Sequence, residues 1–256
     1  MPMGDRVLAL NVLGEVEVTR DGVPVALPPS RKTRALLAYL AITGRRLRRD
    51  PLCTLFWDIP NDPRGALRWS LSKLRPLLDE PGHTRIVADR DTVALDLSRS
   101  IIDVVAVRKR IGLSITDAPT EALQEAAAAF RGEFLQGLDL PDCGDFQAWC
   151  AGERQAARTL QTDILRALVA RLTDDPIAAI PHAQTLVGLA PMDEIARATL
   201  IQLLAAAGRK AEAEQHYVTG IRILERPGAR SSGELVETWR KVAETDSEPR
   251  LAKQQL

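Results

Sequence analysis

The chain has 256 residues, enough for two domains of ordinary size. With 45% hydrophobic and 27% charged residues it has a globular composition, which excludes an intrinsically disordered chain. The formal net charge is zero, but it is unevenly distributed: residues 1–99 carry 16 basic against 12 acidic residues, and residues 100–256 carry 18 against 22. Within residues 31–75 there are 11 basic residues against 3 acidic ones. This asymmetry indicates a polyanion-binding part joined to another module.

The cysteines and the amino-terminal segment indicate a cytoplasmic protein. Cys53, Cys143 and Cys150 are odd in number and form no CxxC motif, which favours a reducing compartment. We interpret Cys143 and Cys150 as packing residues. The first 18 residues have no apolar segment typical of a signal peptide. No apolar run reaches the length of roughly 18 residues that a membrane helix needs, so no membrane span is expected.

The first thirty residues predict a small antiparallel sheet. The β-rich runs are residues 7–13, 16–19 and 23–27, and Asp21-Gly22 marks a tight turn before the third run. Aromatic residues make up only 4% of the chain, so the cores are expected to consist of Leu, Ile, Val and Ala.

Two helices are predicted next. Ser30 can cap a helix over Arg31–Thr43, which Gly44 ends. A short helix is expected over residues 52–57, followed by a turn at residues 58–62. Between the two helices lies an arginine cluster that is either a solvated loop or a phosphate clamp; its members are Arg45, Arg46, Arg48 and Arg49.

Residues 62–80 predict an amphipathic helix, with Asp62 as its cap and Pro63 at its first position. On a helix of about 3.6 residues per turn, one face is apolar; it carries Leu67, Ser70, Leu71, Leu74 and Leu78. Another face carries Arg64, Arg68, Ser72 and Arg75, flanked by Trp69 and Lys73. The spacing alone fits either a solvated surface helix or a DNA-recognition helix.

A hairpin is predicted after this helix. Residues 85–88 and 92–97 flank Asp89-Arg90-Asp91, which places an arginine near the tip. Strands, three helices and a hairpin in this order predict a winged helix. That context, together with the local positive charge, favours the recognition helix over the solvated one.

The second half predicts an all-helical domain. A helix is expected over residues 120–131, and Asp145 is expected to cap a long helix that runs through Leu172. Three further helices follow, with breaks at Pro191 and Gly208, and Asp193 is expected to cap one of them. Ala179 and Ala213, Leu189 and Ile223, and Ala190 and Leu224 recur at a spacing of 34, the tetratricopeptide (TPR) period.

No residue pattern predicts an enzyme, a metal or a cofactor. His83, His182 and His216 have no ligand partners at metal-site spacing. Phosphate-binding glycine loops and a GxSxG elbow are absent from the sequence. Trp149 and Tyr217 are interpreted as packing residues between helices.

Three segments carry a resemblance to a known family. They are SRKTRALLAYLAITGRRLRRDPLCTLFWD, DPRGALRWSLSKLRPLL and RIVADRDTVALDL. Together they resemble the OmpR-type winged helix of the streptomycete antibiotic regulatory protein (SARP) family. FRGEFLQGL, FQAWCAGER and LAPMDEIARATLIQLLAAAGRKAEAEQHY resemble the bacterial transcriptional activator domain (BTAD), the usual partner of that winged helix.

The resemblance implies an α+β winged-helix domain over residues 1–99, followed by an all-α TPR-like domain over residues 100–245. Residues 246–256 are expected to form a frayed polar tail or a linker that has been cut short. LERPGARSSGEL departs from the regular turn of the family, so the last helix pair is expected to pack differently.

For function, the resemblance implies a sequence-specific transcriptional activator. It would bind direct repeats in double-stranded DNA as a homodimer and contact RNA polymerase. Arg68, Ser72 and Arg75 are the expected base-reading residues, with Arg64, Trp69 and Lys73 flanking them. The expected phosphate contacts are Arg31, Lys32, Arg46, Arg48 and Arg49, and Arg90 would extend the contact from the hairpin.

Two other functions remain open. In the first, the chain is the amino-terminal regulatory module of a larger multidomain signalling enzyme, which its abruptly polar end favours. Alternatively, it is an interaction adaptor whose winged helix does not bind DNA, which the near-neutral pI of 6.9 favours.

Overall fold

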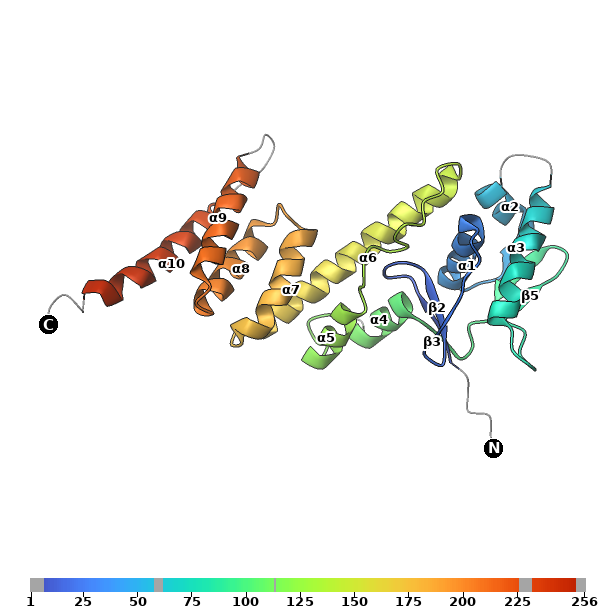
Figure 1. Cartoon of the computed structure of the whole chain (residues 1–256), viewed down its shortest axis with the longest axis horizontal. Coiled ribbons are helices and arrows are strands. Elements are labelled where there is room, and N and C mark those ends of the chain that lie inside the picture. The colour runs from blue at the N-terminus through green and yellow to red at the C-terminus, as the bar shows by residue number, and fades with distance from the viewer. Residues whose placement is uncertain (1–6, 58–61, 113, 226–231, 252–256) are drawn as a thin grey trace, which may run out of the picture. The chain divides into compact units, whose positions relative to one another are not determined.

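The computed structural model describes residues 7–57, 62–112, 114–225 and 232–251 (Figure 1). The chain divides into two compact units. The first unit consists of Met1–Gly112 and Ala128–Thr159, and the second of Leu113–Ala127 and Leu160–Leu256. A strand-rich amino-terminal part followed by helices confirms the predicted fold class.

The first unit begins with a four-stranded sheet in the order β3-β2-β1-β7. Its strands are β1 (Leu8–Asn11), β2 (Glu17–Arg20), β3 (Val23–Val25) and β7 (Ser100–Ile102). The first three form the predicted antiparallel meander, with shorter strands than expected. Asp21 and Gly22, with φ of 52° and 78°, form the predicted turn. The sequence did not predict β7, which pairs in parallel with β1.

The three predicted helices follow, and their caps explain where two of them begin. They are α1 (Arg31–Thr43), α2 (Arg49–Trp57) and α3 (Pro63–Leu78). Ser30 accepts a hydrogen bond from the Thr33 N–H at 3.3 Å, and Asp62 accepts one from the Gly65 N–H at 2.7 Å. Gly44, with a φ of 60°, ends α1 as predicted. Most of the turn expected at residues 58–62 lies outside the described residues.

The prediction of a loop through the arginine cluster was partly wrong. Leu47 and Arg48 form strand β4, and α2 begins at Arg49, three residues before the predicted start at residue 52. Strand β4 joins the predicted hairpin, β5 (Ile86–Ala88) and β6 (Thr92–Leu95), in a sheet of order β4-β6-β5. Residues 47 and 48 form a strand because β6 supplies hydrogen-bond partners for their backbone N–H and C=O groups.

The prediction of purely aliphatic cores was also wrong for the first unit. Tyr39 of α1, Phe56 of α2, and Phe146 and Trp149 further along the chain form an aromatic cluster. The ring centroids of Tyr39 and Trp149 are 4.8 Å apart in an edge-on arrangement. Four of the chain's aromatic residues thus pack together in the core of the first unit, and Trp149 packs between helices as predicted.

The compact units do not follow the predicted boundary at residue 99. After β7 comes α4 (Asp103–Ile111), whose Asp103 side chain accepts hydrogen bonds from the Val12 and Leu13 N–H groups at 2.8 and 2.9 Å. The Leu135 N–H in turn donates to the Val12 carbonyl at 2.9 Å. Residues 128–159 therefore belong to the same unit as the winged helix because they complete the hydrogen bonding of its first sheet.

The second unit is a stack of helices. Apart from α5 (Thr120–Ala128), which is shorter than predicted, it contains the second half of α6 (Gly144–Arg171), followed by α7 (Pro176–Leu189), α8 (Glu194–Ala206), α9 (Lys210–Leu224) and α10 (Glu234–Leu251). The breaks at Pro191 and Gly208 are confirmed. The repeat residues Ala179 and Ala213 are both fully buried, so the small side chains lie where paired helices pack.

Details of the helix ends differ from the predictions. Asp193 caps α8 as expected, accepting a hydrogen bond from the Ala196 N–H at 3.0 Å. Asp145 is not a cap, because α6 already begins at Gly144. Helix α10 continues to Leu251, so residues 246–251 are helical rather than a frayed tail. Tyr217 and Trp239 stack with centroids 5.0 Å apart, which confirms Tyr217 as a packing residue.

Within the described residues, no helix is long and apolar enough to cross a membrane. Cys53, Cys143 and Cys150 are all buried and free. No group of three or more His, Cys, Asp or Glu side chains in the described part of the chain is placed to hold a metal ion.

Candidate nucleic-acid interface

Helix α3 has the two faces that its sequence predicts. Leu67, Leu71 and Leu74 are at most 1% exposed and pack in the core. The opposite side, here called the basic face of α3, is exposed and carries Arg64, Arg68, Ser72 and Arg75. The flanking Trp69 keeps half of its surface exposed. An exposed tryptophan among cations is unusual for a solvated helix, since large apolar surfaces are normally buried.

A buried hydrogen bond fixes the orientation of α3. The Thr33 hydroxyl of α1 donates to the Ser70 hydroxyl of α3 at 3.0 Å, and both side chains are at most 2% exposed. Two buried hydroxyls that satisfy each other define the helix register more strictly than leucine contacts do. The basic face is therefore turned outward by a specific contact between α1 and α3.

Two arginines of the basic face are paired with carboxylates. The Arg64 guanidinium donates to Asp50 Oδ1 of α2 from both Nε and a terminal nitrogen, at 3.0 and 2.7 Å. This hydrogen bond is the main reason why the pKa of Arg64 is raised above its usual value. Arg68 lies 3.3 Å from Asp62, the residue that caps α3. Both arginines are thus paired with acids at the start of α2 and of α3.

The remaining residues of this face have no acidic partner among the residues that the structure describes. Lys73 Nζ lies 5.5 Å from the centre of the Trp69 ring, a cation–π distance. The Ser72 hydroxyl donates to the Trp69 carbonyl at 2.7 Å and still has lone pairs to accept hydrogen bonds. Arg75 is exposed and forms no ion pair with any described residue.

The arginine cluster lies against the hairpin, which the sequence order alone does not reveal. A terminal nitrogen of Arg46 lies 3.1 Å from Asp89 Oδ2 and 3.0 Å from the Thr92 hydroxyl. Arg49 Nε donates to the Asp89 carbonyl at 2.8 Å. Arg90 is the next residue and is exposed at the tip. The structure thus brings cations of two separate predicted segments together.

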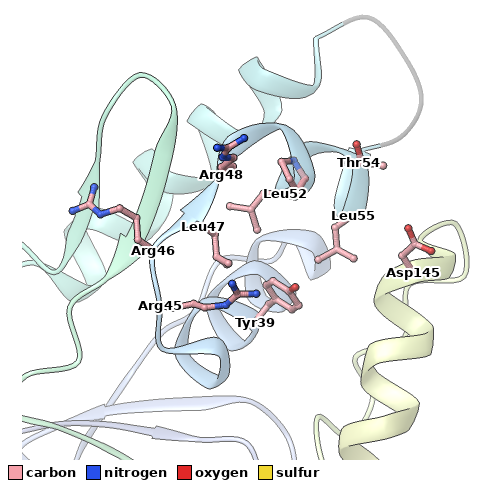
Figure 2. A pocket seen from close by; sticks show the side chains of 10 residues that line it. Tyr39, Arg45, Arg46, Leu47, Arg48, Leu52, Thr54, Leu55 and Asp145 are labelled. Atoms are coloured by element: carbon pink, nitrogen blue, oxygen red, sulfur yellow. The ribbon is translucent and has the colours of Figure 1, made fainter.

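A cavity of about 650 Å³ lies beside the cluster, between the end of α1 and α2 (Figure 2). In Figure 2 the Arg45 side chain points toward Tyr39, whereas Arg46 points away from the cavity. Arg48 is exposed on β4 above Leu52 and has no acidic partner among the described residues. Arg45 and Arg48 form no ion pair with a described residue, whereas Arg46 pairs with Asp89 of the hairpin.

Arg31 and Lys32 occupy the first turn of α1 and make no hydrogen bond or ion pair with the hairpin residues that the structure describes. Of the predicted phosphate contacts, the structure joins Arg46 and Arg49 to the hairpin but not these two.

Comparison with known proteins assigns the family. The model of the bacterial transcriptional activator domain matches residues 95–242, more than half of the chain. The chain belongs to the BTAD family. No curated protein matches this BTAD protein.

The solved structure of Mycobacterium tuberculosis EmbR, in complex with a low affinity phosphopeptide, is similar to this BTAD protein. The two align with a TM-score of 0.66 and 22% sequence identity. The alignment covers 94% of this chain but only 66% of the EmbR chain. The likeness extends over both units and supports the fold, a winged helix followed by a helical domain.

By its family, the BTAD protein is therefore a transcriptional regulator. One class of residue on the candidate surface was not predicted from the sequence, namely the acids that pair with the arginines. These acids are Asp50, Asp62 and Asp89. Asp62 was recognisable as a helix cap, but Asp50 and Asp89 lie 14 and 43 positions from their arginines, beyond any local pattern.

Proposed function

We propose that this BTAD protein binds specific sequences of double-stranded DNA by placing α3 in the major groove. The observation that carries the proposal is the exposed basic face of α3 opposite a buried leucine face, with the Thr33–Ser70 hydrogen bond behind it. An α-helix of this kind fits the major groove of B-DNA, where each base pair presents a distinct pattern of donors and acceptors.

The side chains of the basic face have separate roles in this proposal. Arg68, Ser72 and Arg75 read base edges, and a bidentate arginine–guanine contact gives about 1–3 kcal/mol of discrimination. Arg64, Trp69 and Lys73 flank this contact. The phosphate contacts come from Arg31, Lys32, Arg46, Arg48 and Arg49. Arg90 reaches the adjacent backbone or minor groove from the hairpin.

We further propose that the protein is a cytoplasmic activator that binds direct repeats as a homodimer and contacts RNA polymerase. A single winged helix covers few base pairs, so useful affinity requires two adjacent half-sites. The helical second unit, which resembles a TPR stack, provides surface for protein contacts.

Selection of binding sites from randomised duplex DNA tests this proposal. The whole chain is used, because residues 128–159 belong to the same compact unit as the winged helix. The expected result is an enriched motif that occurs twice in the same orientation. If no sequence is enriched and the affinity for DNA does not depend on salt, the proposal of sequence-specific DNA binding is contradicted.

A further inference from the structure

We propose that Asp89, an acidic residue inside the basic surface, is a positioning residue for DNA binding. It fixes the hairpin tip and the arginine cluster in one arrangement, so that Arg46, Arg49 and Arg90 contact the same stretch of DNA backbone. This inference rests on the proposed DNA-binding function. Asp89 would support DNA binding although its carboxylate is negatively charged, like DNA itself.

The hairpin turn between β5 and β6 depends on Asp89. The register of β5 and β6 pairs Ala88 with Val93, and the Asp89 N–H donates to the Thr92 carbonyl at 3.1 Å, which leaves a loop of two residues. Two-residue hairpin loops usually require positive φ angles, because such turns match the twist of the strands. Neither Arg90 nor Asp91 has a positive φ.

The Asp89 side chain stabilises this less favourable turn. Its Oδ1 accepts hydrogen bonds from the N–H groups of Asp91 and Thr92, at 2.8 and 2.7 Å. An aspartate at the first position of a turn stabilises the turn in this way. The tip that carries Arg90 thus takes its shape from the Asp89 carboxylate.

Asp89 also links the hairpin to the arginine cluster. Asp89 Oδ2 accepts a hydrogen bond from the Thr92 hydroxyl at 2.7 Å and lies 3.1 Å from the terminal nitrogen of Arg46. The Asp89 backbone carbonyl accepts from Arg49 Nε at 2.8 Å. Asp89 therefore contacts both Arg46 and Arg49, which are distant in the sequence, and directly precedes Arg90.

The network also stabilises the ionised form of Asp89. The Thr92 hydroxyl, followed by the two backbone N–H groups, lowers the pKa of Asp89 to about 2. An isolated exposed ion pair contributes little to stability, but here the carboxylate is also held by several hydrogen bonds.

Asp91 provides a matched control. It lies in the same turn and carries the same charge, but its side chain makes no hydrogen bond or ion pair with a described residue. If acids in this turn only repel DNA, Asp89→Asn and Asp91→Asn should both strengthen binding. If Asp89 is a positioning residue, Asp89→Asn should weaken binding, whereas Asp91→Asn should leave it unchanged or strengthen it.

The test measures the dissociation constant of the whole chain for its selected DNA duplex at several NaCl concentrations. We expect Asp91→Asn to bind as tightly as the wild type or up to about threefold more tightly. We expect Asp89→Asn to bind about tenfold more weakly, with a salt slope reduced by about one to two, because one or two phosphate contacts are lost. Partial unfolding would lower the active fraction without changing that slope.

A second variant keeps the test decisive if Asp89→Asn does not fold. Thr92→Val keeps the carboxylate but removes the hydroxyl that bonds Asp89 and Arg46, and we expect a weaker effect in the same direction. The inference is overturned if wild-type binding is salt-dependent and neither Asp89→Asn nor Thr92→Val weakens it or changes its slope. A wild-type chain that shows no salt-dependent binding contradicts the proposed function itself.

Discussion

Asp50 and Arg64 form a two-point contact between the start of α2 and the first turn of α3. Both Nε and a terminal nitrogen of Arg64 donate to Asp50 Oδ1, at 3.0 and 2.7 Å. Because both side chains are largely exposed, the pair contributes little to stability, but it occupies a cation on the proposed DNA-binding face. DNA must compete with Asp50 for Arg64.

Asp50→Asn is therefore expected to strengthen binding to random-sequence DNA by about two- to fivefold, since it frees Arg64 from an exposed ion pair. The measurement is a titration of unrelated duplex DNA at low salt. Asp142→Asn, which removes an exposed acid elsewhere in the first unit, is the control and should leave the affinity unchanged. Equal effects of the two substitutions would mean that only net charge matters.

Arg68 and Arg48 should affect DNA binding differently. Arg68→Ala removes a proposed base contact, so the ratio of specific to non-specific affinity should fall by about 1–3 kcal/mol, or roughly five- to 150-fold. Arg48→Ala removes a proposed phosphate contact, so both affinities should fall about equally and the salt slope should decrease by about one. Titrations of selected and random duplexes distinguish these outcomes. If neither variant alters binding, the basic face of α3 and the arginine cluster are not the DNA-binding surface.

Asp103 is expected to be essential for the stability of the first unit. Asp103→Ala leaves the buried Val12 and Leu13 N–H groups without an acceptor, and each such group costs about 1–3 kcal/mol. The free energy of unfolding in urea should fall by about 2–4 kcal/mol. Asp103→Asn keeps one acceptor oxygen and should be less harmful. A loss below about 0.5 kcal/mol in Asp103→Ala would show that water replaces the carboxylate there.

The hairpin should lose stability in acid. Hydrogen bonds from His83 and Ser98 lower the pKa of Asp96 to about 2, below its ordinary value of 3.8. A lowered pKa means that the folded state favours the ionised carboxylate. This stabilisation is therefore complete above about pH 4 and is lost as the pH falls toward 2.

Urea unfolding midpoints measured from pH 5 to pH 2 test this expectation. Asp96→Asn removes the titrating group, so its stability should depend less steeply on pH than that of the wild type. Parallel curves for the two proteins would show that Asp96 titrates alike in the folded and unfolded states.

The sequence by itself determined the helices that have local signals at their ends. Ser30 and Gly44 bound α1, and Asp62 with Pro63 starts α3. Helical periodicity alone predicted which side of α3 is buried, and the leucines confirm it. The family, too, follows from segments of the sequence, as the match over residues 95–242 confirms.

Only the tertiary structure decided the contacts between residues far apart in the chain. Local periodicity carries no information about pairs such as Arg46 and Asp89, or Asp103 and Val12, which lie 43 and 91 positions apart. Strand β4 exists because β6 supplies its partners, and β7 because β1 does. The chain therefore encodes its helices locally. The pairing of arginines with acids and the extent of the first unit depend instead on long-range hydrogen bonds.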